Sequence, residues 1–330
     1  MANGTDKGLM GAWLALGRWI GAHLMVVVPA GVALGVLFPQ LLLPIKPFIP
    51  VLFAIMTFQN SLGNDLRSLR NALANPLILV AILLMVHVAM PLVTFSAASL
   101  LFGVASPTVA GVVLEYSVPI GASTVMWIGM FSGELALGLT ALLTSTLLAP
   151  FTIPLTLQVL VGTTVEVDAL GMMGDMLFMI ALPAVAATVL NELSHGWAKE
   201  RLAPATTPLS RIILPVIVST NATGISDYLH HLTPRLVGIM LFMLVFAVLS
   251  FIIGMGLARV LSRGDDERFV AVSFSCGIRN VSAGAVLASQ YFGPEVMFPA
   301  VIGTLFQQFL AALFGQVMSR MLASRSQRTS

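Results

Sequence analysis

The sequence predicts an all-α membrane protein of ten transmembrane helices, and three observations carry that prediction. Of its 330 residues, 58% are hydrophobic and 9% charged, whereas about a quarter of the residues in soluble domains are charged. Ten apolar segments reach the roughly 20 residues that a helix needs to cross a bilayer. Two of these segments carry polar interruptions at corresponding positions. We therefore expect one transmembrane domain over residues 1–330.

Proline and glycine mark most connections between the expected spans, so these connections are short. The chain starts with one early lysine and a long apolar run without a small-residue cleavage site. This pattern favours a retained first span over a cleaved signal peptide. The spans are expected at residues 19–38, 44–62, 76–102, 107–131, 134–161, 169–190, 207–223, 234–260, 267–291 and 295–322.

Basic residues gather on one side of the expected membrane, which the positive-inside rule assigns to the cytoplasm. With the N-terminus inside, twelve of them fall in cytoplasmic segments, and only Lys46 and Arg235 fall in outer loops. We therefore expect a multi-pass protein of the cell inner (plasma) membrane with both termini in the cytoplasm. The twelve are Lys7, Arg18, Arg67, Arg70, Lys199, Arg201, Arg259, Arg263, Arg268, Arg320, Arg325 and Arg328.

An internal symmetry divides the chain into two halves of five spans each. Because five is odd, the halves would insert in opposite orientations, as in the inverted repeats of many secondary transporters. We place repeat one at about residues 12–162 and repeat two at about 169–322. In the fourth span SVPIGASTVMWIGMFSGE ends at Glu134, and in the ninth SCGIRNVSAGAVLASQYFGPE ends at Glu295. Both stretches have a polar, glycine-containing interruption, which predicts two broken helices.

The two interruptions predict a binding site for a small anion at the middle of the membrane. An unwound segment survives at that depth only where it lines a cavity. The second half-helices would point free amide groups at this cavity, one starting near Gly121, Ser123 and Thr124, the other near Arg279. An arginine at this depth is by default a functional-site hypothesis. The alternative is an internally paired Arg279 that only braces the crossing.

Two titratable residues at membrane depth are candidates for ion coupling. Glu115 lies just before the fourth-span interruption and is an evident partner for Arg279. Burial without a counter-charge favours the neutral acid, and an arginine opposite favours the carboxylate, so this residue suits a proton-coupled carrier. His87 could serve the same end. A structural hydrogen-bond donor is the alternative for this histidine.

Amide side chains at depth are further candidates for the cavity wall. Asp175 and Arg211 lie near span ends and are interpreted as ordinary interfacial charges. Cys276 is the single cysteine, which excludes an internal disulfide. No cofactor or metal site is expected, because the pair of histidines in the outer loop after the seventh span has no further ligand nearby. The amide candidates are Gln59, Asn60, Asn221, Gln307 and Gln308.

Several motifs resemble the bile acid:sodium symporter family over nearly the whole chain. SVPIGASTVM resembles the family's Pro-Gly-Gly-Thr-(Ala/Ser)-Ser-Asn-Val-Met, and SCGIRNVSAG resembles its Glu-x-Gly-Met-Gln-Asn-Ser-Gly. HVAMPL is similar to the family's Gln-x-x-Met-Pro-Leu. The resemblance implies a panel and a core domain, crossing fourth and ninth helices, and transport by alternating access. It also implies that Asn280 and Gln308 line the substrate cavity.

The sodium-ligand positions that the resemblance implies are altered in this chain. Gly138 and Leu142 offer no side-chain oxygen, Ser275 replaces a shared glutamate, and Arg279 replaces a glutamine. A guanidinium and a sodium ion a few ångströms apart in a low dielectric repel each other, so sodium is not expected in the second site. The implied positions are Ser123, Thr124, Gly138 and Leu142 for one site, and His87, Ser275 and Arg279 for the other.

Three functional hypotheses follow from these observations. The first is a secondary active transporter of a small organic anion without the usual two-sodium coupling, working as a proton-coupled carrier, an exchanger or a uniporter. The second is a sodium-coupled symporter of organic anions or bile acids with ligands rearranged around Glu115. The third is a non-transporting membrane receptor or an intramembrane enzyme, which no catalytic signature supports. The expected partners are the solute and the lipid bilayer, without nucleic acid, and the oligomeric state stays open.

Overall fold

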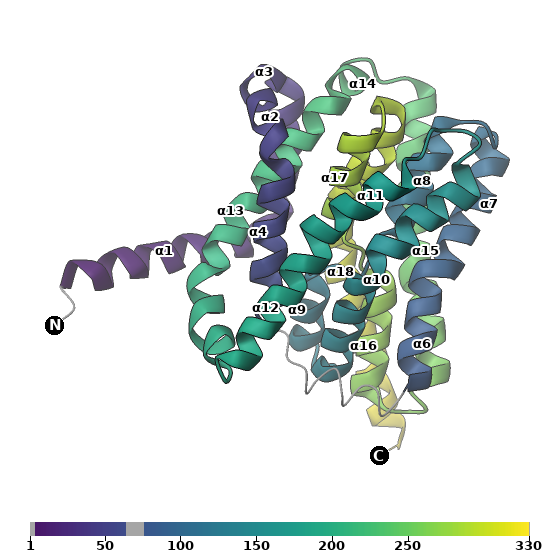
Figure 1. Ribbon diagram of the computed structural model, residues 1–330. Helices are drawn as coiled ribbons and strands as arrows, with labels where there is room; N and C mark the ends of the chain where they lie inside the picture. Colours follow the sequence, from purple (N-terminus) through teal and green to yellow (C-terminus); the bar gives the residue numbers. More distant parts are fainter. Residues whose placement is uncertain (1–3, 64–75, 330) are drawn as a thin grey trace.

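Helices make up nearly all of the chain that the computed structural model describes, residues 4–63 and 76–329 (Figure 1). Proline stands in the first turn of several helices, where a residue without an amide hydrogen costs no hydrogen bond. In chain order the elements are α1 (Gly4–Ala22), α2 (Leu24–Leu37), α3 (Pro39–Leu42), η1 (Leu43–Phe48), α4 (Ile49–Ser61), α6 (Pro76–Leu84), η2 (Met85–Ala89), α7 (Met90–Phe102), α8 (Pro107–Ser117), α9 (Ser123–Met130), α10 (Leu135–Val161), α11 (Ala169–Met176), η3 (Leu177–Ala181), α12 (Leu182–Leu193), η4 (Ala198–Leu202), α13 (Ala203–Ala222), η5 (Thr223–Ile225), α14 (Ser226–His230), α15 (Pro234–Leu261), α16 (Asp266–Gly277), α17 (Val281–Tyr291) and α18 (Pro294–Thr329).

Within the described residues, seven helical segments are long and apolar enough to cross a membrane. The pair formed by Met10–Ala22 and Leu24–Leu37 is an eighth candidate, bent by 84°. The expected fourth and ninth spans are each divided into two shorter helices, so the count of ten spans stays a prediction. Arg67 and Arg70 lie outside the described residues. The seven segments are Pro39–Ser61, Pro76–Phe102, Leu135–Val161, Ala169–Leu193, Ala198–His230, Pro234–Leu261 and Pro294–Ser324.

Within the first expected span, residues 19–38, the chain bends at His23, and α2 begins at Leu24. The helix α1 therefore projects sideways from the bundle (Figure 1). It is held to α13 at two points: the Trp13 indole Nε1 donates to the Ala205 carbonyl at 2.8 Å, and the Arg211 Nη1 donates to the Gly17 carbonyl at 2.7 Å. Sequence periodicity did not separate α1 from α2, because both are apolar.

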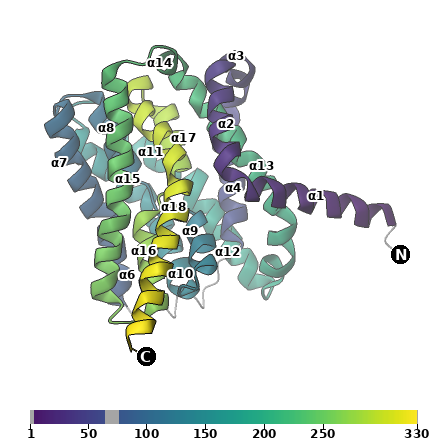
Figure 2. The same ribbon diagram turned by 180° about the vertical axis from the view of Figure 1, so that it is seen from behind.

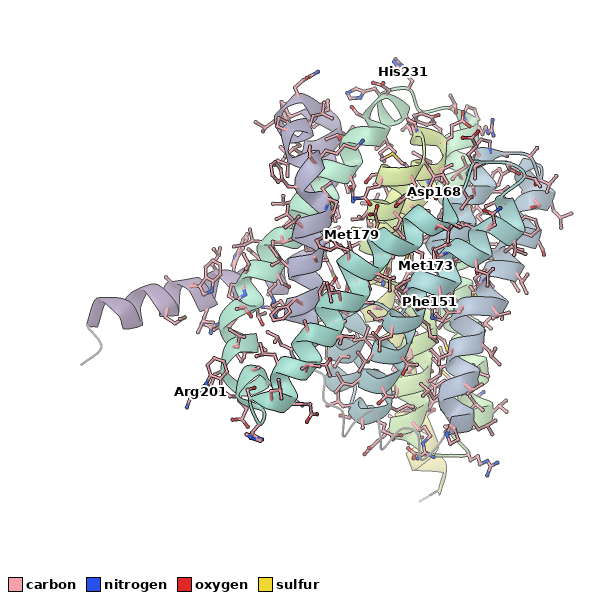
Figure 3. All side chains as sticks on the ribbon, in the orientation of Figure 1. Phe151, Asp168, Met173, Met179, Arg201 and His231 are labelled. Atoms are coloured by element: carbon pink, nitrogen blue, oxygen red, sulfur yellow. The ribbon has the colours of Figure 1, made fainter. Side chains whose placement is uncertain are left out.

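The long helices pack in two groups, which contact each other where α11 packs on α10, α13 on α17 and α2 on α18. In one group α13 packs on α2 and α4, and α4 packs on α12; in the other α8 packs on α7 and α18, and α15 packs on α16 and α18 (Figure 2). Arg201 and His231 lie at opposite ends of the molecule (Figure 3). Large apolar side chains such as Leu100 and Leu170 are 87% and 80% exposed, which indicates a lipid-facing surface.

Both polar interruptions are non-helical, and they contact each other. The first break separates α8 from α9 and the second separates α16 from α17. The Asn280 amide donates to the Pro119 carbonyl at 2.8 Å, and the Gly121 amide donates to the Ile278 carbonyl at 3.2 Å. These bonds form an isolated antiparallel bridge between Ile120 and Arg279. Backbone groups that hydrocarbon could not solvate are thus partnered across the crossing.

Candidate functional site

A cavity of about 410 Å³ opens beside the contact between the two helix breaks. We call it the central cavity, and its volume falls within the roughly 300–1,000 Å³ usual for small-molecule sites. Both breaks contribute to its wall, together with α4, α13 and α18. It is lined by Gly21, Leu24, Met56, Gln59, Asn60, Gly63, Gly121, Ala122, Ser123, Val125, Met126, Leu139, Leu142, Ala203, Thr207, Ser210, Arg211, Leu214, Arg279, Asn280, Val281, Ser282, Gln307 and Gln308.

Most of the residues predicted from the sequence to bind substrate line this cavity. Gly121, Ser123, Arg279, Asn280 and Gln308 do so, as do the amides Gln59, Asn60 and Gln307. Two candidates do not line it. Thr124 is fully buried with its hydroxyl unpartnered, and Asn221 is 1% exposed with both amide atoms unpartnered.

The sequence reasoning missed one wall of the cavity, which α13 supplies. Thr207, Ser210, Arg211 and Leu214 follow the spacing of one helical face and all line the cavity. This helical spacing of polar residues is the sequence signal for the wall, whereas the position of Arg211 near a span end favours an interfacial charge. A second omission is Trp127, whose indole Nε1 donates to the Gln308 Oε1 at 3.1 Å, while the Gln308 Nε2 donates to the Ser123 hydroxyl at 3.3 Å.

Two helix starts adjoin the central cavity. The N-cap of α17 is Asn280, whose side-chain oxygen accepts from the Ala283 amide at 3.3 Å. The N-cap of α9 is Ala122, which has no side chain able to cap the helix. Amide groups at such a start carry partial positive charge and favour an anion.

Arg279 lies in the second helix break, and its guanidinium is directed toward Val86 and the small cavity beside Glu115 and Tyr116. Its side chain is 4% exposed, and Nη1 lies 3.4 Å from the Val86 carbonyl, whereas Nε and Nη2 have no hydrogen-bond partner. Its own carbonyl accepts from the Gln307 side-chain amide. These two nitrogens are buried, so an anion in the central cavity would reach them only after the side chain moves.

Glu115 lies on the other side of Arg279 and does not line the central cavity. Both residues border a cavity of about 20 Å³, enough for about one water molecule. Their charged atoms do not approach within 4.0 Å, so the direct ion pair considered from the sequence is absent. The carboxylate fits between two glycines. A Cβ added at Gly284 would lie 2.6 Å from Oε2, and one added at Gly303 would lie 2.6 Å from Oε1.

His87 has a hydrogen-bond partner on each ring nitrogen. Nε2 lies 2.8 Å from the Ser145 hydroxyl and Nδ1 lies 2.9 Å from the Thr152 hydroxyl. Ser145 also accepts from the Ile120 amide in the first helix break at 3.0 Å. One assignment satisfies the network: a neutral imidazole accepts from Ser145 and donates to Thr152. This geometry favours the structural interpretation of His87, which braces the break through Ser145.

At two of the implied sodium positions, Gly138 and Leu142, no side-chain oxygen is present. The space beside Gly138 is filled by Ile128, whose Cδ1 would lie 2.3 Å from an added Cβ. Ser275 is fully buried, and its hydroxyl has no partner. Sodium, like other hard cations, is bound by several oxygen ligands. Of the first implied site, Ser123 and Thr124 keep hydroxyl groups while Gly138 and Leu142 have none, and the second implied site includes Arg279.

Several known proteins are similar to this chain along most of its length. A family model described as the Sodium Bile acid symporter family matches residues 49–232. YbaS, an uncharacterized protein of Bacillus subtilis, is 34% identical over 295 residues, which span 89% of this chain and 96% of YbaS. YocS of the same organism, described as an uncharacterized sodium-dependent transporter, is 23% identical, with 87% of this chain and 88% of YocS covered. The probable sodium/metabolite cotransporter BASS1 of Arabidopsis thaliana is 25% identical, with 95% of this chain and 78% of BASS1 covered.

Proposed function

The chain belongs to the Sodium Bile acid symporter family, and from that membership we propose that it is a secondary active transporter of a small organic anion of carboxylate type. Members of this family are transporters rather than enzymes. The chain is accordingly a multi-pass membrane transporter with a small-molecule substrate. The substrate class and the coupling are the proposed part.

The observation that carries the carboxylate proposal is the environment of Arg279 in the central cavity. Arg279 lines the cavity next to the starts of α9 and α17, and two nitrogens of its buried guanidinium have no hydrogen-bond partner among the described residues. Among the described residues, the side chains that line the cavity include no carboxylate. A carboxylate is planar and matches the fork of a guanidinium with two parallel hydrogen bonds.

Alternating access is the proposed transport mechanism. Ten spans in two inverted five-helix repeats, divided into panel and core domains, would provide it. The contact between the two helix breaks supports this arrangement, because it places both interruptions at one site. We propose in addition that the protein lies in the plasma membrane with both termini in the cytoplasm, as the distribution of basic residues favours.

The proposed coupling does not use two sodium ions. Arg279 would take the place of a bound cation, and protons would couple through Glu115, unless the protein is an exchanger or a uniporter. The charged or titratable groups around Glu115 in the small cavity are Arg279 and Tyr116. Sodium-coupled symport is the second candidate function, because YocS and BASS1 are described as sodium-dependent or sodium cotransporting.

Uptake into proteoliposomes tests the proposal, with radiolabelled butyrate as the monocarboxylate probe. We expect uptake that is independent of sodium and lost in Arg279→Gln. Arg259→Gln, in the last turn of α15 and outside the cavity, is the control and should transport normally. Glu115→Gln should abolish any dependence on the pH gradient. Sodium-dependent uptake that persists in Arg279→Gln would refute the substituted-cation idea and favour the second candidate.

A further inference from the structure

The helix α1 projects sideways from the bundle in both views (Figure 1 and Figure 2), and the proposed transport mechanism does not use it. Its part Met10–Ala22 is bent by 84° relative to α2, Leu24–Leu37. Two helices at nearly a right angle do not both run along the membrane normal. Since α2 is the one that packs along α13, a membrane-spanning helix, α1 lies roughly parallel to the membrane plane.

Contacts with the first turns of α13 set the depth of α1. The Trp13 indole Nε1 donates to the Ala205 carbonyl at 2.8 Å, and a Cβ added at Gly17 would lie 2.6 Å from Pro208 Cγ. The segment Ala198–His230, which contains α13, has 33 residues and a length of about 50 Å, about 20 Å more than the hydrocarbon core. About 10 Å therefore extends beyond the core at each end. Ala205 lies about 10 Å along this segment, at the boundary between acyl chains and headgroups.

The exposed residues of α1 fall on an apolar and a charged flank. Gly17 is buried against α13, and its two neighbours in sequence project about 100° to either side of that contact. Leu16, 44% exposed, occupies one flank, and the exposed Arg18 occupies the other. Two tryptophans at this end of the molecule, Trp19 and Trp197, are 57% and 55% exposed. Tryptophan is enriched at membrane interfaces, and a helix with one apolar and one basic flank lies in the plane of such an interface.

We propose that α1 is an in-plane helix that binds the phospholipid surface at the Arg201 end of the molecule, with Leu16 among the acyl chains and Arg18 at the headgroup phosphates. In the proposed topology this surface is the cytoplasmic leaflet. A second copy of the chain would have to cover Arg18 together with Trp19 and desolvate its charge. A phospholipid surface offers phosphate to the arginine and hydrocarbon to the apolar residues. The inference goes beyond the proposed function, because it holds for any transported solute.

The test measures the membrane depth of spin labels on single-cysteine variants of the full-length protein in vesicles of phosphatidylethanolamine and phosphatidylglycerol. Oxygen reports access from the hydrocarbon, and a water-soluble nickel chelate reports access from water. Cys276 is fully buried, so the unsubstituted protein serves as the blank. Ala12→Cys and Ala22→Cys, at exposed positions ten residues apart, should lie within about 5 Å of the same depth, because an in-plane helix stays level. Leu16→Cys should lie about 5–10 Å deeper than Arg18→Cys, up to the diameter of a helix.

Val26→Cys and Ala33→Cys on α2 are the matched control for a spanning helix. Both positions are exposed, and their labels should differ in depth by about 10 Å over seven residues. A steady change of about 15 Å from Ala12→Cys to Ala22→Cys would make α1 part of a span and overturn the inference. Equal access of the nickel chelate to all α1 labels, or Arg18→Cys deeper than Leu16→Cys, would overturn it too. So would spin–spin broadening between α1 labels that disappears on dilution with unlabelled protein, since it would assign the surface to a second copy.

Discussion

Gly121→Ala tests whether the contact between the two helix breaks holds the site together. A Cβ at Gly121 would lie 2.6 Å from the Arg279 carbonyl oxygen and 3.1 Å from Ile278 Cγ2. Ordinary contact begins at 3.4 Å, so the two breaks would have to separate by about 0.8 Å. The obstacle is backbone, which cannot rotate away as the end of a flexible side chain can.

The cost of this substitution follows from the geometry. Overpacking of this kind costs about 1–3 kcal/mol. Weakening the bond from the Gly121 amide to the Ile278 carbonyl adds about 1 kcal/mol. We expect a loss of about 2–4 kcal/mol, which corresponds to a melting temperature lowered by roughly 5 °C or more. Binding of carboxylates should weaken as well, because Arg279 belongs to the displaced segment.

Thermal unfolding in detergent, followed by tryptophan fluorescence, measures the effect. Gly129→Ala, on the half-helix α9 that follows the break, is the matched control, because a Cβ there meets its nearest atom at an ordinary 3.5 Å. It should be neutral or stabilising by up to about 1 kcal/mol, since alanine is the better helix former. Equal melting temperatures for Gly121→Ala and Gly129→Ala would refute the role assigned to the crossing.

Three further predictions concern the residues around the breaks. Gly138→Ser should lower the melting temperature because the added side chain clashes with Ile128. The double variant Gly138→Ser/Ile128→Ala should regain part of that loss. If the melting-temperature changes of the two single variants simply add in the double variant, this packing is contradicted. His87→Ala should cost about 2–4 kcal/mol by removing the imidazole partner of the buried Ser145 hydroxyl and of the half-buried Thr152 hydroxyl. The pH profile of uptake should stay unchanged, whereas a flattened profile would return His87 to the coupling mechanism. Gly303→Ala should lower the free energy of unfolding by about 1–3 kcal/mol, and by less when Glu115 is replaced by alanine. A double-mutant cycle of unfolding measures this difference. Equal losses with and without Glu115→Ala would contradict the contact between Gly303 and the carboxylate.

The helix breaks were the part of the fold most open to prediction from the sequence. Glycine and polar side chains inside a long apolar segment are costly in lipid, so their position is visible without a structure. The bend at His23 was not visible in the same way, because apolar residues continue on both sides of it.

The candidate site was only partly predictable. Arg279 drew attention because its neighbours in sequence are apolar, whereas Arg211 lies near a span end, where arginine is ordinary. Only the packing of α1 and α13 showed that Arg211 lines the cavity. The proximity of Glu115 and Arg279 was anticipated, but their separation by more than 4.0 Å depends on how α8 and the second break are packed.

The sequence by itself determined the membrane class and the two interruptions of this protein. These features follow from local chemistry, namely the transfer of each side chain to lipid. The tertiary structure alone decided that Ile128 fills the space beside Gly138 and that two glycines enclose the carboxylate of Glu115. It also decided that two arginines share one cavity. The physical reason is that such contacts depend on distances between residues far apart in the chain, which close packing of helices sets and local composition does not.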